Sequence, residues 1–219
     1  MARPYCIGLT GGIGCGKTSV TRVFRELGAA VVDTDEIAHE LTGPGGEAMD
    51  AIRREFGREF SAADGSLDRA RMRRLAFSDP QARARLEAIL HPLIRAQSRS
   101  RLNAATQPYA LVVVPLLFET GAYGDLLRRV LVVDCDESQQ IERTMRRSNL
   151  TEGEVRAIIA AQVSRKERIV RADDVLNNDG DMSALRKQVE ALHAKYLLLA
   201  RDGDAAAAEY GPKSPGKHK

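Results

Sequence analysis

The segment that most constrains this chain reads G-G-I-G-C-G-K-T and satisfies the pattern G-x-x-x-x-G-K-[ST] in full. In this pattern the glycines let successive backbone N–H groups converge on phosphate oxygens, the lysine reaches the β- and γ-phosphates, and the threonine hydroxyl ligates Mg²⁺. Lys17 is also the only lysine before position 166, and its compact ammonium fits between two phosphate groups where a planar guanidinium does not. The expected phosphate-binding residues are Gly11, Gly12, Ile13, Gly14, Cys15, Gly16, Lys17 and Thr18, with Thr18 also the expected metal ligand.

The flanks of this segment supply the structural context that the pattern needs. Residues 5–10 form a short apolar run that suits a buried strand, and apolar residues recur at helical spacing from Val20 to Leu27. The order strand, glycine loop, helix directs the positive end of the helix dipole at the phosphates. A dinucleotide pattern fits poorly because Gly12, Gly14 and Gly16 are spaced by two. A mononucleotide triphosphate is therefore the expected ligand.

Composition indicates an ordinary globular protein. The chain has 219 residues, 43% of them apolar and 29% charged, and its net charge of +3 is too small to indicate nucleic-acid binding. No apolar stretch approaches membrane-spanning length, and three cysteines without metal-ligand spacing suit a reducing compartment. We expect a cytoplasmic protein that binds neither nucleic acid nor membrane, as a monomer or weak homo-oligomer.

Five short apolar runs separated by helical patterns predict an α/β fold, a five-stranded parallel sheet covered by helices. The predicted strands are residues 5–10, 30–33, 110–114, 130–134 and 174–177. Helical segments near 47–56, 68–77, 80–90 and 92–105 indicate an inserted helical subdomain. The chain is predicted to divide into a core (1–42, 108–138 and 172–200), an insert (about 43–107), a lid (about 139–171) and a disordered basic tail (201–219).

Two carboxylates follow the second predicted strand. Asp33 and Asp35 end an apolar run, and the carboxyl ends of parallel strands form the ligand crevice. We expect one of them to accept or orient the proton of an acceptor hydroxyl and the other to hold a water of Mg²⁺. The alternative for Asp33 is that it, or Thr34, caps the helix that begins near Glu36.

Other candidates follow the third and fourth predicted strands. Pro115 ends the third strand, and Glu119 lies within reach of an acceptor or metal, or is a solvated loop acid. Asp134 resembles the metal-holding acid of many phosphate-loop proteins. We favour a structural role for it, at the end of a strand before a helix capped by Asp136 or Ser138.

Arginines gather between the fourth and fifth predicted strands. Arg143 and Arg147 are four residues apart, and Arg165 and Arg168 are three apart, so each pair shares a helix face. Phosphoryl transfer spreads negative charge over oxygens, which arginines on a helical flap stabilise as they close over the triphosphate. The alternative is a solvated charged face paired with nearby glutamates.

With these residues in place, the chain resembles the dephospho-CoA kinase family from about residue 4 to 200. The resemblance rests on L-T-G-G-I-G-C-G-K-T at 9–18, V-V-D-T-D-E-I-A at 31–38, D-G-S-L-D-R at 64–69, H-P-L-I at 91–94, V-P-L-L-F-E at 114–119, A-A-Q at 160–162 and A-D-D-V-L-N-N at 172–178. The glycine loop is shared by many families, whereas the combination of the other motifs is selective.

The resemblance implies ATP-dependent phosphorylation of the ribose 3′-hydroxyl of dephospho-CoA, on the fold of nucleoside monophosphate kinases. It implies that Asp35 is the catalytic base and that Arg143 neighbours adenine or phosphate. Asn178 is expected to help hold adenine. It also implies that the inserted helices bind the substrate, with Asp64, Arg69, His91 and Pro92 among their residues. The other residues expected to bind the substrate are Asp33, Asp35, Pro115, Glu119 and Arg165. Lys17 and Asp35 are expected to line opposite sides of one cleft.

Two alternatives remain. One is another phosphate-loop kinase, acting on a nucleoside monophosphate or a sugar; the other is a nucleotide switch, although the guanine-reading N-K-x-D element is absent. The family usually has serine where this chain has Cys15. A thiol beside a helix N-terminus is expected to have a lowered pKa and to be oxidisable, unless Cys15 is only a passive small side chain.

Overall fold

The structure, a computed structural model, describes residues 3–202. These residues fall into two compact units. The first holds the described residues up to Val32 and those from Ala105 on, and the second is Asp33–Ala104. The predicted tail lies almost wholly outside the described residues. Within residues 3–202, no helix combines the length and apolar character needed to cross a membrane.

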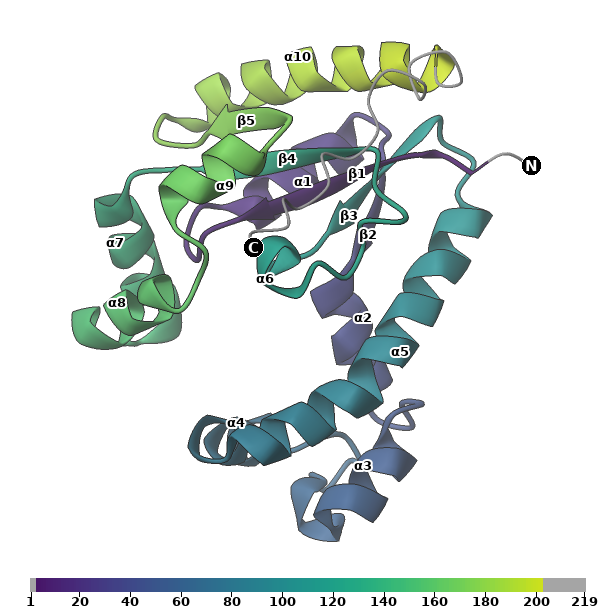
Figure 1. Ribbon diagram of the computed structural model, residues 1–219, viewed down its shortest axis with the longest axis vertical. Coiled ribbons are helices and arrows are strands. Elements are labelled where there is room, and N and C mark those ends of the chain that lie inside the picture. Colours follow the sequence, from purple (N-terminus) through teal and green to yellow (C-terminus); the bar gives the residue numbers. More distant parts are fainter. Residues whose placement is uncertain (1–2, 203–219) are drawn as a thin grey trace, which may run out of the picture. The chain divides into compact units, whose positions relative to one another are not determined.

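A five-stranded sheet forms the centre of the first unit (Figure 1). Its spatial order is β2-β3-β1-β4-β5, and the pairs β1–β3, β1–β4 and β4–β5 are parallel. This confirms the predicted α/β fold. The strands are β1 (Tyr5–Gly11), β2 (Ala30–Asp33), β3 (Tyr109–Val113), β4 (Arg129–Asp134) and β5 (Asp174–Asn177). Each lies within one residue of its predicted bounds, because a short apolar run defines it. Strands β1, β3 and β4 are mostly buried, whereas β5 alternates buried and exposed residues.

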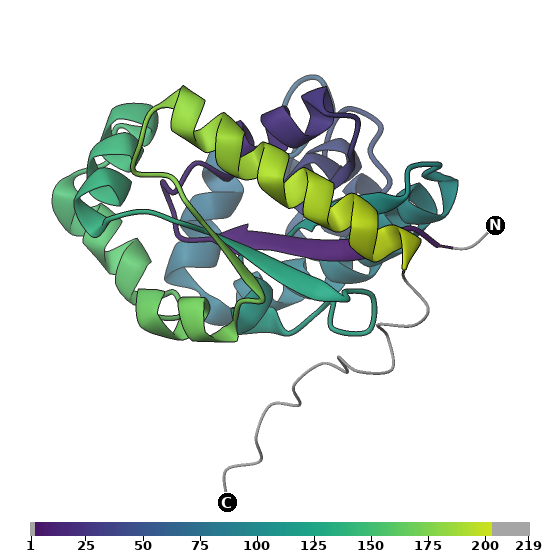
Figure 2. The ribbon, with the colours of Figure 1, turned by 90° about the horizontal axis from the view of Figure 1, so that it is seen from above.

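Helices α1 (Lys17–Glu26) and α10 (Met182–Arg201) pack against each other on the sheet. Phe24 of α1 stacks on Tyr196 of α10 with ring centroids 6.1 Å apart, and both side chains are fully buried. Figure 2 shows α10 lying across the strands. This packing fixes the start of α1, and with it the glycine loop, at the carboxyl end of the central strand β1.

Three further helices lie between β4 and β5, where the arginine-rich lid was predicted. They are α7 (Glu137–Ser148), α8 (Glu152–Ala160) and α9 (Arg165–Arg171), and the short α6 (Leu117–Thr120) follows β3. The predicted capping box opens α8: the Thr151 side chain accepts the Glu154 N–H, and the Glu154 side chain accepts the Thr151 N–H.

The second unit is helical. It contains α2 (Thr34–Leu41), α3 (Met49–Phe56), a 3₁₀ turn η1 (Arg58–Phe60), α4 (Arg69–Ser78) and α5 (Pro80–Ala104). The two helical segments predicted at 80–90 and 92–105 are one helix, which continues through Pro92. A proline removes one intrahelical hydrogen bond. Here Ala88, whose carbonyl loses that donor, is exposed, as are His91 and Pro92, so water can replace the lost partner.

Candidate active site

The glycine loop between β1 and α1 depends on glycine at two positions with a left-handed backbone. Gly14 has φ 75° and Gly16 φ 87°, a region that residues with a Cβ rarely adopt. A Cβ on Gly14 would lie 2.5 Å from the Gln140 carbonyl oxygen, and one on Gly16 would lie 2.3 Å from Asn178 Nδ2. The loop is therefore packed closely against α7 and the end of β5.

The Lys17 side chain crosses this loop. Its Nζ donates hydrogen bonds to the carbonyl oxygens of Gly11 at 2.8 Å and Gly12 at 3.2 Å. Thr18, in the first turn of α1, is exposed. The ammonium, an accessible hydroxyl and the first N–H groups of α1 thus lie together at one helix N-terminus, a geometry that favours phosphate.

One face of α7 borders the loop. Arg143 Nη2 donates to the Asn178 carbonyl oxygen at 3.0 Å, and Asn178 Nδ2 donates to the Cys15 carbonyl oxygen at 2.8 Å. The structure therefore brings Arg143 and Asn178 to the loop, and their contacts with the nucleotide stay predictions. Arg147, one turn further along α7, is exposed.

Two buried polar atoms of α7 also face the loop. Gln140 Oε1 and Thr144 Oγ1 lack a hydrogen-bond partner among residues 3–202, and each lies 2.7 Å from where a Cβ of Gly12 or Gly14, respectively, would be. Buried polar atoms in native proteins are normally satisfied by protein, water or a bound molecule. Their position supports a ligand site at the loop.

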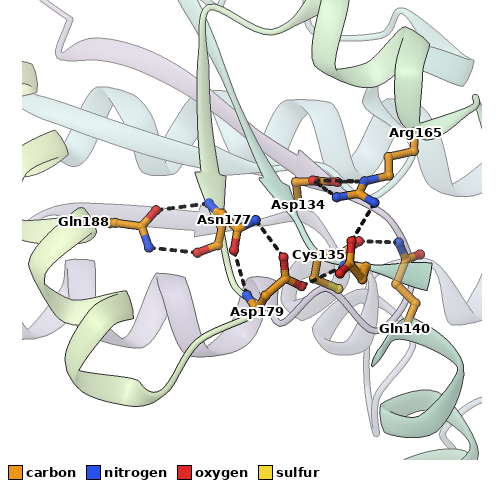
Figure 3. A network of polar contacts seen from close by, with 8 residues as sticks. Asp134, Cys135, Gln140, Arg165, Asn177, Asp179 and Gln188 are labelled. Carbon is orange, nitrogen blue, oxygen red and sulfur yellow. Dashed lines mark hydrogen bonds and ion pairs between the residues drawn. The ribbon is translucent and has the colours of Figure 1, made fainter. Parts of the chain in front are cut away.

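The end of β4 carries a network of charged side chains, shown in Figure 3. Arg165 Nε and Nη2 bind the Asp134 carboxylate at 2.7–3.0 Å, and Arg165 Nη1 binds Asp136 at 2.8 Å. The hydrogen bonds that Arg165 donates to Asp134 and, to a lesser extent, to Asp136 raise the pKa of Arg165. Asp134 is only 5% exposed, so the bidentate pair fastens α9 to the sheet.

The interpretation of Asp134 as a structural residue agrees with this ion pair, but the predicted helix cap does not form. Asp136 occupies the N-cap position of α7 without a side-chain capping bond. Its carboxylate binds Arg165 instead. Arg165, predicted to bind substrate, therefore has both carboxylates as partners in this structure.

Pro115 and Glu119, the two predicted site residues after β3, both take part in hydrogen bonds within the first unit. The Pro115 carbonyl oxygen accepts a hydrogen bond from Thr10 Oγ1 at 3.1 Å. The Glu119 carboxylate accepts the N–H of Val163, in the α8–α9 connection, at 2.9 Å. Glu119 thus holds the lid segment, and its predicted contact with the acceptor stays a prediction.

Cys15 and Cys135 are fully buried neighbours behind the loop. The hydrogen bond with Cys135 lowers the pKa of the Cys15 thiol; burial opposes this, and the charges of Lys17 and Arg168 add to it, for a net lowering. The pKa of Cys135 is raised by the same hydrogen bond and by burial. The lowering expected at Cys15 is present, and its first cause is the hydrogen bond with a neighbouring side chain, that of Cys135.

In the second unit, Asp33 caps α2: its Oδ1 accepts the N–H groups of Asp35 at 2.9 Å and Glu36 at 3.4 Å. This confirms the capping interpretation of Asp33. The cap places Asp35 in the first turn of α2 with its side chain exposed. That Lys17 and Asp35 line one cleft stays a prediction.

The other predicted substrate residues of this unit differ in their surroundings. Asp64 Oδ1 accepts both the N–H and the hydroxyl of Ser66, which lowers the Asp64 pKa and shapes a turn. Arg69 Nη2 donates to Thr42 Oγ1 at 2.9 Å and to the His39 carbonyl oxygen at 3.2 Å. His91 and Pro92 lie exposed on α5.

The sequence did not single out Gln140, Thr144 or Gln162 as side chains that face the loop. Gln140, Arg143, Thr144 and Arg147 follow the spacing i, i+3, i+4, i+7, which defines one helix face. This spacing could have identified Gln140 and Thr144 from the sequence, but only the two arginines of the face were considered. Gln162 contacts the loop from the α8–α9 connection, and no short-range pattern links it to Ile13.

A parallel sheet of this strand order, with a glycine loop on its central strand and a lid of arginine-bearing helices, defines the class of P-loop kinases. A family model described as dephospho-CoA kinase matches residues 5–184. Dephospho-CoA kinase of Chromobacterium violaceum is 59% identical over 197 residues, 90% of this chain and 96% of that protein. That of Nitrosospira multiformis is 56% identical over 195 residues, 89% and 98%. The chain belongs to the dephospho-CoA kinase family.

Solved structures agree with this fold. A protein of Thermus thermophilus has a TM-score of 0.74 at 35% identity, covering 89% of this chain and 98% of that one. Dephospho-CoA kinase from Campylobacter jejuni has a TM-score of 0.65 at 24% identity, with 88% and 96% coverage. Both likenesses extend over nearly the whole of the compared chains.

Proposed function

We propose that this kinase transfers the γ-phosphoryl group of ATP to the ribose 3′-hydroxyl of dephospho-CoA, giving coenzyme A and ADP, the final step of coenzyme A synthesis. The family match over residues 5–184 is the observation that carries the proposal. The glycine loop supports the donor half of the reaction, because the left-handed backbone of Gly14 and Gly16 leads into the N-terminus of α1, where the first N–H groups of the helix favour phosphate.

On the donor side, Lys17 exchanges its two loop carbonyls for the β- and γ-phosphates and stabilises the charge that develops on the transferred group. Arg143 and Arg147 face the nucleotide from α7, and Asn178 holds the adenine end. The hydroxyl of Thr18 would ligate Mg²⁺, and Asp33 or Asp35 would hold one of its waters. Bound Mg²⁺ neutralises phosphate charge in reactions of this kind.

On the acceptor side, Asp35 is the general base. Its carboxylate takes the proton of the 3′-hydroxyl as that oxygen forms its bond to the γ-phosphorus and the bond to the ADP oxygen breaks. Asp33 supports this role by capping α2, which fixes the first helical turn that carries Asp35. Both carboxylates thus contribute, one by chemistry and one by position.

The second unit offers a place for the rest of the acceptor. A cavity of about 220 Å³ is lined mainly by apolar side chains, among them Ala38, Leu67, Met72 and Leu86. Arg69 and Arg73 also line it. An apolar wall with two guanidinium groups suits a substrate that joins a diphosphate to a long, partly apolar arm, as dephospho-CoA does.

A panel of acceptors tests the proposal. The full chain is incubated with ATP, Mg²⁺ and dephospho-CoA, a nucleoside monophosphate or a sugar, and phosphorus NMR locates the new phosphate. We expect transfer only to dephospho-CoA, at the 3′ position. Asp35→Asn is expected to bind ATP normally and to lose transfer, whereas Glu36→Gln, which removes the neighbouring exposed carboxylate, should keep it. Transfer to another acceptor alone would favour the alternative kinase.

A further inference from the structure

The connection between α8 and α9 touches the glycine loop through one side chain. Gln162 Oε1 accepts the backbone N–H of Ile13 at 3.1 Å. Ile13 lies between the glycines of the loop, so this bond joins two segments 149 residues apart in sequence. A glycine-rich loop loses much conformational freedom when it is ordered, and a fixed N–H group in its middle reduces what nucleotide binding has to order.

The segment that carries Gln162 is itself held firmly. The N–H of the next residue, Val163, donates to Glu119 Oε1 at 2.9 Å, and the Val163 carbonyl oxygen accepts a hydrogen bond from Arg168 Nη1. Arg168 is only 5% exposed, and its Nη2 lies 2.9 Å from where a Cβ of Gly12 would be. The connection is thus anchored on both sides of its backbone, and Arg168 contacts the loop as well.

A third fastening lies one turn of α9 away, where Arg165 binds Asp134 at the end of β4. The backbone on which Gln162 lies is therefore held in place by these hydrogen bonds. Among residues 3–202, no side chain other than that of Gln162 accepts the Ile13 N–H. Through it, the position of the α8–α9 connection sets the shape of the loop.

We infer that Gln162 is a positioning residue for phosphoryl transfer: it preorganises the phosphate loop through the Ile13 N–H and couples the lid to that loop. Gln162 has no contact with the reacting atoms in this role. Loss of the bond frees the loop, so ATP binds less tightly, while the groups that act in the transition state remain in place. The kinetic half of this inference rests on the proposed function.

Three variants of the full chain test it. Gln162→Met keeps the side-chain length and removes the acceptor, and Gln162→Glu keeps both the length and an acceptor oxygen. Gln188→Met is the matched control, because Gln188 Oε1 accepts a backbone N–H at the same distance, 3.1 Å from Asn177, at the edge strand (Figure 3). Hydrogen exchange of the Ile13 amide is measured by NMR without nucleotide, together with Tm, kcat and the KM for ATP.

For Gln162→Met we expect Ile13 exchange and the KM for ATP each to rise about 3- to 10-fold, the effect of losing one hydrogen bond, with kcat changed less than about twofold. Gln162→Glu should restore Ile13 protection, and Gln188→Met should lower Tm without changing either readout. Wild-type exchange in Gln162→Met, or equal effects in Gln188→Met, would overturn the inference. Hydrogen exchange of Ile13 is measured without substrate, so it tests this inference independently of the proposed function.

Discussion

The side-chain amide of Asn178 donates a hydrogen bond to the carbonyl oxygen of Cys15 at 2.8 Å and joins residues 163 positions apart. Asn178 is 8% exposed. Its own carbonyl oxygen accepts from Arg143, and its N–H donates to the Asp134 carbonyl oxygen at 2.8 Å. One asparagine thereby connects the phosphate loop with β4, the end of β5 and the lid.

Replacing Asn178 with aspartate should loosen this connection. The variant keeps the shape of the side chain but removes its donor and sets a carboxylate against the Cys15 carbonyl oxygen. We expect ATP affinity to fall about tenfold or more, since an unsatisfied buried group costs about 1–3 kcal/mol. Nucleotide titration measures this. Asn103→Asp, at an exposed position on α5, should bind ATP like the wild type; equal affinity of the two variants would refute the role of Asn178.

Alanine variants of two glycines with the same φ angle distinguish the effect of backbone strain from that of a steric clash. Gly16 and Gly28 both have φ 87°, but a Cβ on Gly16 would lie 2.3 Å from Asn178 Nδ2, whereas nothing lies within 4 Å of one on Gly28. Both alanine variants should lose about 1–2 kcal/mol of stability from backbone strain. Only Gly16→Ala should also lose ATP binding. Denaturant unfolding and nucleotide titration, run side by side, would contradict this if Gly28→Ala lost binding too.

Asp174, at the amino end of β5, is expected to make stability depend on pH. Burial raises its pKa, but hydrogen bonds from Arg129 Nε, at 3.0 Å, and from Lys195 outweigh that effect and lower it. Because the folded pKa lies below the unfolded value of about 3.9, the stabilisation is present above that value and is lost as pH falls through the folded pKa.

Asp174→Asn should therefore destabilise the fold by about 3 kcal/mol at pH 7, because it leaves the Arg129 guanidinium, whose side chain is only 15% exposed, without this charged partner. The difference from the wild type should shrink as pH falls below about 4. Urea unfolding across this range measures it. Asp50→Asn breaks a surface pair in which Asp50 is 85% exposed and should cost less than about 1 kcal/mol. A difference for Asp174→Asn that stays constant with pH would be contrary to the expectation.

Cys15 is expected to make the enzyme sensitive to peroxide. Its lowered pKa enriches the thiolate, which is the form that peroxide oxidises to a sulfenic acid. Inactivation of the wild type should quicken as pH rises, and Cys15→Ser should be spared. Cys6, whose pKa is raised by burial, supplies the control, and Cys6→Ser should lose activity as the wild type does. Equal inactivation rates of Cys15→Ser and wild type would show that Cys15 is a passive small side chain.

Much of the fold was predictable because local patterns and tertiary packing agree. The five predicted apolar runs are the five strands of the structure, and Thr151 and Glu154 form the predicted capping box. The continuous α5 was missed because a proline usually marks a break, while exposure of Ala88 and Pro92 makes the lost bond tolerable here.

Site residues could be predicted where they follow one another in a single sequence motif. The loop and Lys17 follow from one motif, whereas the hydrogen bond between Arg143 and Asn178 joins residues 35 positions apart that no motif links. The pairing of Asp136 with Arg165, in place of a helix cap, depends on how α9 returns to the sheet. Contacts such as Gln162 with Ile13 arise only once the chain is folded, so no spacing rule reveals them.

Release of ADP by the full chain, measured in a coupled assay with and without dephospho-CoA, tests the central claim most directly. We predict ADP release that depends on dephospho-CoA and falls about 10²- to 10⁴-fold in Lys17→Ala, with Tm little changed. ADP release at the same rate without dephospho-CoA, or undiminished in Lys17→Ala, would contradict the account.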